Sequence, residues 1–178
     1  MEKFKSGFVS IIGRTNVGKS TLINSLVREK VAITTSKTQT TRTAIRAIVN
    51  RPNSQIIFID TPGIHKPRTK LGETMINTAL GTMPNVDVNL FIVEATSDTI
   101  GKGDRIILDK IKELNKKTIL VINKIDLVKK ENLLKLIKIY SAEYKFETII
   151  PVSALKGENL ELLLSEIEKC IPNRSGIL

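Results

Sequence analysis

The sequence predicts an α/β fold, a three-layer domain in which helices cover both faces of a mainly parallel, six-stranded sheet. Three observations predict it. Short apolar segments alternate with longer segments of helical periodicity, the short segments are apolar on both faces, and aromatic residues are scarce (4%) although 41% of the chain is hydrophobic. Buried parallel strands are rich in Ile, Leu and Val in this way. The length, 178 residues, is that of one domain.

Six segments are predicted as strands because they are short, apolar and rich in β-branched residues. Between the second and the third lies Arg51-Pro52-Asn53, a turn signal that favours a hairpin. We therefore expect one antiparallel edge strand in the otherwise parallel sheet. The predicted strands are residues 7–12, 43–50, 55–60, 88–94, 118–122 and 148–152.

Five segments are predicted as helices because their apolar residues recur at helical spacing. The first begins directly after a glycine-containing loop, and Pro172 ends the last. The predicted helices are residues 19–27, 71–80, 104–114, 131–144 and 160–171. Strands and helices that alternate in this order predict helices packed on both faces of the sheet.

Composition excludes several classes of protein. The single cysteine, Cys170, excludes internal disulfides and a cysteine-based zinc site. No apolar run approaches the roughly 20 residues of a membrane helix, so we expect a cytoplasmic chain. The net charge of +10 favours anionic partners such as nucleotide, RNA or an acidic lipid surface. The lysine-rich segments 110–117 and 129–138 are interpreted as solvated helix faces rather than a dedicated RNA patch.

Residues 13–20 read Gly-Arg-Thr-Asn-Val-Gly-Lys-Ser and fit G-x-x-x-x-G-K-[ST] between a predicted strand and a predicted helix. Glycine lets the backbone wrap closely around phosphate oxygens, and the helix N-terminus supplies amide donors. Lys19 is expected to bridge the outer phosphates, and the Ser20 hydroxyl to bind Mg²⁺. The predicted nucleotide-binding residues of this loop are Gly13, Asn16, Val17, Gly18, Lys19, Ser20 and Thr21.

A second phosphate motif begins with Asp60, which ends an apolar strand at the edge where α/β folds bind ligands. Asp60 is expected to hold Mg²⁺ through a water. The Gly63 amide of Asp60-Thr61-Pro62-Gly63 is expected to sense the γ-phosphate. A threonine hydroxyl from the segment 34–42, or from a residue next to it, would complete the coordination shell of Mg²⁺. This segment and residues 60–63 are therefore predicted to be switches whose structure depends on the nucleotide. The candidate hydroxyls are those of Thr38, Thr40, Thr41 and Thr43.

Two segments that directly follow predicted strands indicate that the bound base is guanine. Asn123-Lys124-Ile125-Asp126 follows the strand at 118–122, and Asp126 can accept from both the ring N–H and the exocyclic amine of guanine. Asn123 is expected to brace the loop, and the stem of Lys124 to lie over the base. Ser153-Ala154 follows the last strand, and both residues are predicted to contact the nucleotide, where the Ala154 amide can donate to the guanine keto oxygen. Adenine would leave Asp126 unpaired.

Ile64 stands where Ras-like GTPases carry a glutamine that orients the attacking water. An isoleucine can neither donate nor accept, so hydrolysis is expected to be slow unless another group or ion helps. The single histidine, His65, is interpreted as a surface residue of a loop rather than as a replacement base.

Together these motifs resemble the Era family of bacterial, translation-factor-class P-loop GTPases, which have a Ras-like G domain. The resemblance also rests on Gln39-Thr40-Thr41-Arg42, on the run from Gly63 to Pro67 and on Ser153-Ala154-Leu155. It adds Leu155 to the nucleotide-binding residues and implies that Thr41 is the metal ligand of the first switch, with Ser20 and Asp60. Lys19, Thr41 and Gly63 are then the catalytic residues. The resemblance also implies a potassium ion held through Asn16.

The resemblance implies partners as well: 16S ribosomal RNA, the 30S subunit during its biogenesis, and peripheral association with the inner face of the cell membrane. DNA is not expected. Residues 1–178 correspond to the GTPase domain of such a protein, and the family's C-terminal KH RNA-binding domain is expected in the full-length protein but is absent from this chain. Thr15 departs from the family, which usually has proline there.

Two alternatives remain open at this point. One is the G domain of a tRNA-modifying GTPase or of a tandem-domain ribosome-assembly GTPase. The other is a binding module that acts through GTP occupancy with negligible turnover. A P-loop kinase is disfavoured by the guanine motif at residues 123–126.

Overall fold

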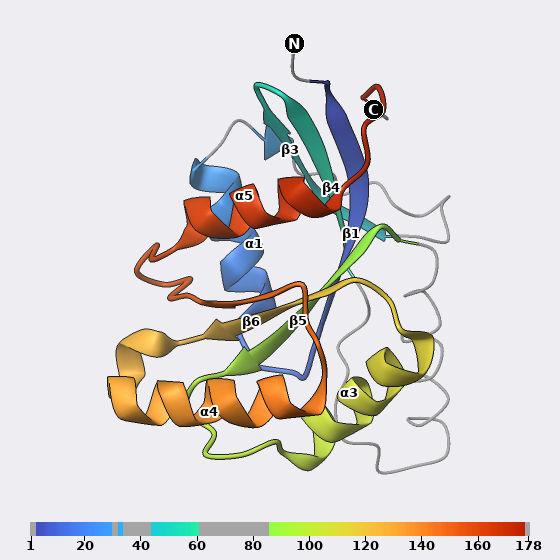
Figure 1. Ribbon diagram of the computed structural model, residues 1–178. Coiled ribbons are helices and arrows are strands. Elements are labelled where there is room, and N and C mark those ends of the chain that lie inside the picture. Colours follow the sequence, from blue (N-terminus) through green and yellow to red (C-terminus); the bar gives the residue numbers. More distant parts are fainter. Residues whose placement is uncertain (1–2, 30–31, 34–43, 61–85, 177–178) are drawn as a thin grey trace.

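The computed structural model describes residues 3–29, 32–33, 44–60 and 86–176. Its strands form one sheet in the order β2-β3-β4-β1-β5-β6-β7 (Figure 1). The strands are β1 (Lys5–Gly13), β2 (Ala32–Ile33), β3 (Ala44–Arg51), β4 (Ser54–Asp60), β5 (Val88–Glu94), β6 (Thr118–Asn123) and β7 (Thr148–Pro151).

The centre of the sheet is parallel. β1 lies between β4 and β5 and pairs in parallel with both, and β5, β6 and β7 continue the parallel order. β3 is antiparallel to β4, and two residues, Pro52 and Asn53, join them. The carboxyl ends of the parallel strands therefore lie along one edge of the sheet, where ligands of such folds bind.

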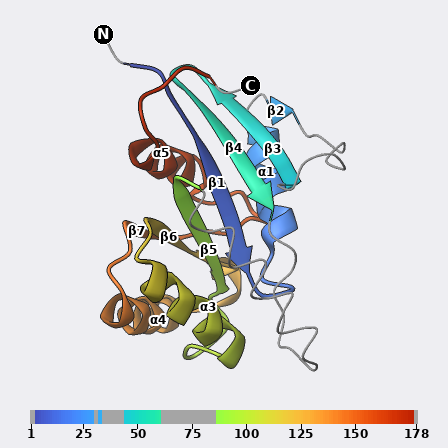
Figure 2. The same cartoon turned by 90° about the vertical axis from the view of Figure 1, so that its right-hand side faces the viewer.

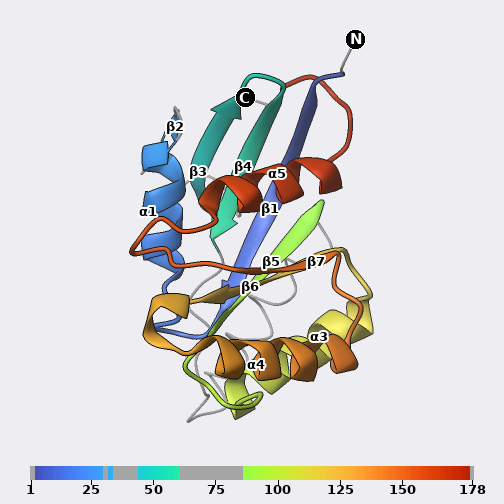
Figure 3. The same ribbon diagram turned by 60° about the vertical axis from the view of Figure 1, so that its left-hand side comes forward.

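Helices cover both faces of the sheet. They are α1 (Lys19–Glu29), α3 (Lys102–Leu114), α4 (Lys130–Glu143) and α5 (Leu160–Cys170), with a short 3-10 helix at Ile125–Leu127. α1 and α5 pack on one face, and α3 and α4 on the other, as the two turned views show (Figures 2 and 3). Within the described residues, no helix is long and apolar enough to cross a membrane.

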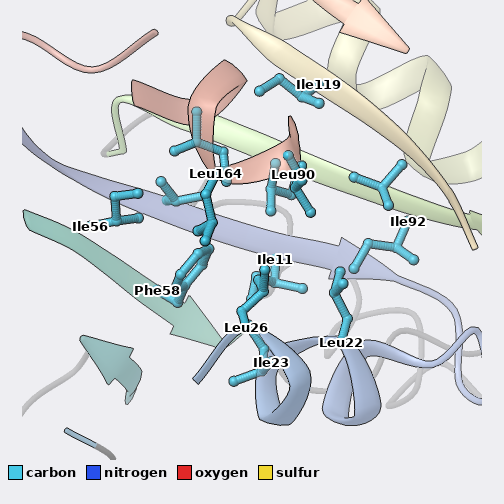
Figure 4. Close-up of a cluster of buried hydrophobic side chains, with 14 of the residues drawn as sticks. Ile11, Leu22, Ile23, Leu26, Ile56, Phe58, Leu90, Ile92, Ile119 and Leu164 are labelled. Atoms are coloured by element: carbon cyan, nitrogen blue, oxygen red, sulfur yellow. The ribbon is translucent and has the colours of Figure 1, made fainter. Parts of the chain in front are cut away.

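The core has one apolar cluster on each face. On the first face, Leu22 and Leu26 of α1 and Leu164 of α5 pack against strand residues such as Ile11 and Phe58 (Figure 4). On the other face, α3 and α4 pack on the opposite side of β1, β5 and β6. Interior strands therefore bury apolar side chains on both faces, and this explains their nearly continuous apolar sequence.

The segment after α5 returns to the start of β1. Asn173 pairs with Lys5, and the Arg174 amide donates to the Phe4 carbonyl at 3.1 Å. The Ser6 hydroxyl also donates to the carbonyl of Ser175 at 2.7 Å. The described N-terminal and C-terminal segments thus lie side by side at the start of β1, at the opposite end of the strand from the loop that follows Gly13 (Figure 1).

The predicted fold class is confirmed: a mainly parallel six-stranded sheet with one reversed strand, between helices. The two-residue strand β2 adds a seventh member outside β3, so β3 is not itself the outermost strand. A strand of two residues is too short to produce a pattern that can be recognised in the sequence. Bounds differ from prediction by one or two residues in most elements. The helix predicted at residues 71–80 lies outside the described residues.

Candidate nucleotide-binding site

The loop after β1 is shaped by residues with positive φ. Asn16 has a φ of 69° and Gly18 a φ of 100°, and α1 begins at the next residue, Lys19. Asparagine and glycine adopt such angles at little cost. A Cβ at Gly18 would also collide with the side-chain amide of Asn123. The tight turn therefore requires glycine at position 18.

This loop borders an open cavity of about 630 Å³. The cavity lies over the start of α1 and is closed on another side by Arg46 of β3. Its polar lining is made mainly by the loop and by the first turn of the helix, where amide donors converge. The lining residues are Ile11, Thr15, Asn16, Gly18, Lys19, Ser20, Thr21, Ile23, Arg46 and Lys124.

A second cavity of about 220 Å³ adjoins the first and shares Gly18, Thr21 and Lys124 with it. Its other walls come from the loop after β6 and from the loop after β7. Two of its leucines are largely exposed, Leu127 at 64% and Leu155 at 77%. The lining residues are Gly18, Thr21, Asn123, Lys124, Asp126, Leu127 and Leu155.

Asn123 joins three loops. Its buried side chain donates from Nδ2 to the Val17 carbonyl at 2.9 Å and accepts at Oδ1 from the Ala154 amide at 3.0 Å. The Ser25 hydroxyl of α1 donates to the Ala154 carbonyl at 2.7 Å. The phosphate loop, the loop after β6 and the loop after β7 are thereby held in one arrangement.

Asp126 is oriented by a serine. Ser153 Oγ donates to Asp126 Oδ1 at 2.8 Å and itself accepts from the Lys156 amide at 3.1 Å. The hydroxyl proton is therefore directed at the carboxylate, which limits rotation of the Asp126 side chain. Ser153 was predicted to touch the nucleotide, and here its side chain also acts on Asp126.

Lys124 lines both cavities. Its backbone has a φ of 69°, and its Nζ donates to the Asn16 carbonyl at 2.8 Å and to Glu94 Oε2 at 2.9 Å. The ammonium is thus held at the phosphate loop, while its stem borders the 220 Å³ cavity. This is the position from which an aliphatic stem can cover one face of a base.

Arg14 connects the phosphate loop to α3. Its Nε donates to Asp104 Oδ1 at 2.9 Å, and its Nη2 to Glu94 Oε1 at 3.4 Å. The Asp104 side chain is only 1% exposed. Burial raises the pKa of the Asp104 carboxyl, and the hydrogen bond from the Arg14 guanidinium opposes this rise.

The architecture and the motifs match a known family. Residues 8–124 match the family model described as 50S ribosome-binding GTPase. The chain belongs to this GTPase family. The match covers most of β1, strands β2 to β6, the phosphate loop and the start of the guanine motif, and it ends before Asp126 and before the loop after β7.

Bacterial relatives of this GTPase are similar over nearly all of the chain. It is 51% identical over 169 residues to GTPase Era from Caldanaerobacter subterraneus, an alignment that covers 95% of this chain and 56% of that protein. It is 49% identical to GTPase Era from Caldicellulosiruptor saccharolyticus, again over 95% of this chain and 56% of the relative. The chain therefore spans a little over half the length of the curated relatives it matches.

Solved structures agree with this. One is Era from Aquifex aeolicus bound to GDP·AlF₄⁻, at 41% identity and a TM-score of 0.80. Another is Era in complex with MgGDPNP and nucleotides 1506–1542 of 16S ribosomal RNA, at 41% identity and a TM-score of 0.81. Each match covers 98% of this chain and 60% of the solved chain. The resemblance to the Era family is thus confirmed.

Most predicted site residues of the GTPase lie together at the two cavities. Asp60 ends β4 beside Ile11, a residue that lines the larger cavity, but its side chain is not among those described. Thr41 and Gly63 lie outside the described residues. Their predicted roles stay predictions. The Ala154 amide, predicted to donate to guanine, here donates to Asn123 Oδ1.

Sequence reasoning missed four residues of the site: Arg14, Arg46, Glu94 and Asp104. For Glu94 a signal existed, because it ends an apolar strand at the carboxyl edge just as Asp60 does. For the other three no signal existed. Arg14 and its partners Glu94 and Asp104 lie on different elements, 80 to 90 residues apart in the sequence.

Proposed function

We propose that this chain binds GTP and GDP together with Mg²⁺ and hydrolyses GTP slowly, as the G domain of an Era-type GTPase. The observation that carries the proposal is the Asn123 side chain, whose two hydrogen bonds tie the phosphate loop to both base-binding loops. A nucleotide needs its phosphate and base subsites at a set separation. A rigid connection between them before binding lowers the entropy cost of association.

Selection of guanine is supported by Asp126. Its carboxylate borders the 220 Å³ cavity and is oriented by Ser153 Oγ. Guanine offers two donors to such a carboxylate, whereas adenine would offer neither and leave those acceptor positions unfilled, a loss of about 1 to 3 kcal/mol. The stem of Lys124 and the exposed side chain of Leu155 provide apolar surface for the faces of the ring.

The donor set fits Mg²⁺. A serine hydroxyl and an aspartate oxygen are hard ligands, and Mg²⁺ takes one or two of these together with phosphates and waters. Ser20 lines the larger cavity, and Asp60 ends the adjacent strand β4. Bound there, the ion would neutralise charge on the β- and γ-phosphates during transfer. Thr41 is proposed as the third protein ligand.

Slow turnover is proposed from Ile64, which cannot orient water. Asn16 lies in the turn that borders the larger cavity. A potassium ion held through Asn16 would then stabilise the charge that develops on the phosphates during hydrolysis. Phosphate release in potassium and in sodium buffers, at equal ionic strength, tests this. Faster release in potassium is expected, and loss of the difference in Asn16→Ala would support the role of Asn16. Equal rates in the two buffers would contradict it.

The biological setting is proposed from the relatives. Era in complex with MgGDPNP and a 16S ribosomal RNA segment is one of the solved structures most like this chain. We infer that the full-length protein acts in 16S rRNA processing and 30S subunit biogenesis, through a KH domain beyond residue 178, with peripheral membrane association. The GTP site would time this step.

Equilibrium binding of GDP, GTP and ADP, followed by single-turnover phosphate release, tests the central proposal. Tight binding of both guanine nucleotides, weak binding of ADP and slow release are expected. Lys19→Ala should lose most affinity or turnover, because the lysine at this place of the phosphate loop neutralises charge on the outer phosphates. Equal affinity for ADP would contradict guanine selection. Binding without release over hours would instead identify a module that acts by GTP occupancy.

A further inference from the structure

The end of strand β5 lies between the phosphate loop and the base loop. Glu94, its last residue, is the register partner of Asn123 on β6, and the next amide, Ala95 N–H, donates to the Asn123 carbonyl at 2.8 Å. This pairing fixes the backbone of Glu94 beside the residue that precedes Lys124. The carboxylate is thus held at the site by the sheet rather than by a loop.

The Glu94 carboxylate contacts a cation from each side. Oε2 accepts from Lys124 Nζ at 2.9 Å, and Oε1 from Arg14 Nη2 at 3.4 Å. The three side chains are 19% to 31% exposed, so solvent screens these contacts in part. Lys124 Nζ makes a second bond, to the Asn16 carbonyl, and so holds the middle of the phosphate loop.

Arg14 is itself fixed by the first turn of α3. Asp104 accepts from its Nε, and a Cβ at Gly103 would lie 2.5 Å from Arg14 Cδ. The arginine side chain therefore lies directly against the helix backbone. The chain of contacts from α3 through Arg14 and Glu94 to Lys124 links four segments: α3, the phosphate loop, the end of β5 and the loop after β6.

We propose that Glu94 is a positioning residue for nucleotide binding, which holds Lys124 over the base and ties the phosphate loop to α3 through Arg14. This rests on the proposed binding of guanine nucleotides. Glu94 is not among the residues that line the 220 Å³ cavity, whereas Asp126 is. Its loss should therefore weaken GDP and GTP alike and leave the preference for guanine unchanged.

The test measures GDP and GTP affinity and dissociation rate for Glu94→Gln in the 178-residue chain. Weaker binding by about 5- to 30-fold is expected, mostly through faster dissociation, because a part-exposed charged hydrogen bond is lost. The matched control is Glu143→Gln. Glu143 also accepts from two cations, Arg105 and Lys112, but it does so between α3 and α4, away from the two cavities. Its Kd should stay within about 2-fold of the wild type.

A double-mutant cycle separates positioning from general stability. In a Lys124→Met background, Glu94→Gln should cost less than about 2-fold in Kd, because the group it positions is gone. Equal losses in both backgrounds would overturn the proposal. So would an unchanged GDP affinity in Glu94→Gln when the wild type binds tightly. If the wild type bound no guanine nucleotide, the proposed function itself would fail.

Glu94→Asp keeps the negative charge and provides the test if the glutamine variant does not fold. Aspartate is one methylene shorter, so it can reach one of the two cations but not both. Its GDP affinity is expected to lie below the wild type by at least about 2-fold, and above Glu94→Gln where that variant folds. An aspartate variant that binds as tightly as the wild type would overturn the bridging role.

Discussion

In the proposed nucleotide site, Asp126 and Ser153 act together in the recognition of the base. The carboxylate borders the base cavity, and the serine hydroxyl holds it in one orientation by a 2.8 Å hydrogen bond. The serine in turn is held by the Lys156 amide. In the proposed function, selectivity for guanine at the residue scale therefore depends on a charged acceptor and on the group that directs it.

Asp126→Asn is expected to weaken GDP binding by at least about 100-fold, since two charged hydrogen bonds are lost. The asparagine amide can donate to the extra keto oxygen of xanthine, so xanthosine diphosphate should bind better than GDP. Competition binding with the two nucleotides measures this. An unchanged preference for guanine would contradict the base-pocket assignment.

Ser153→Ala removes the orienting hydroxyl and leaves the carboxylate. We expect a smaller loss of GDP affinity, about 3- to 10-fold, with guanine still preferred over xanthine. The comparison with Asp126→Asn in the same titration is the control. A loss as large as that of Asp126→Asn would show that Ser153 does more than orient its neighbour.

Strand β5 carries an unpaired polar side chain. Asn89 is fully buried, and neither its Nδ2 nor its Oδ1 has a hydrogen-bond partner among the described residues. Its register partner on β1, Ser10, also has an unpartnered hydroxyl. Such groups give up their hydrogen bonds to water without replacing them, and this costs stability.

Asn89→Val is expected to raise the free energy of unfolding by about 1 kcal/mol, because valine removes two unpaired polar atoms and suits an interior strand. Urea unfolding at neutral pH measures the change, and GDP affinity should be unaffected. A loss of stability would show that the asparagine amide has partners beyond the described residues.

Helices α3 and α4 are joined by an ion pair whose contribution to stability depends on pH. Arg105 and Lys112 of α3 both donate to Glu143 of α4, and these hydrogen bonds lower the pKa of Glu143 from 4.5 to about 2. A carboxyl with a lowered pKa stabilises the fold above its unfolded pKa, and this contribution is lost as the pH falls from about 4.5 toward 2.

Glu143→Gln should therefore be less stable than the wild type at neutral pH, and the two should converge as the pH falls from about 4.5 toward 2, where the carboxyl of the wild type becomes protonated in both states. The difference should be small because the side chains are partly exposed. Urea unfolding at a series of pH values measures it. A difference that does not depend on pH would contradict the ion-pair explanation.

At the scale of the whole molecule, the net charge of +10 favours contact with polyanions. The relatives that this chain matches are longer, and it covers 56% of their length. We expect the chain by itself to bind a 16S rRNA fragment no better than an unrelated RNA of equal length. Its affinity should fall at least about 10-fold between 50 and 200 mM salt. Filter binding with both RNAs tests this, and a preference for the 16S fragment would place RNA recognition within these residues.

The sequence by itself determined the fold class, the order of the elements and the chemistry of the loops. Apolar strands and periodic helices are local patterns, and the phosphate and guanine motifs are short segments whose meaning depends on a strand before them and, for the phosphate loop, a helix after it. Roles for Asn123, Lys124 and Asp126 could be predicted in this way because all three lie in one short segment after a strand.

Only the tertiary structure decided how these loops are held together. It directs Ser153 Oγ at Asp126, brings Arg14 against Asp104 of α3, and places Glu94 between Arg14 and Lys124. The parallel register of β5 and β6 sets the position of Glu94, and register joins residues that are distant in the chain. Contacts of this kind leave no periodic or local pattern, so they could not be predicted from the sequence.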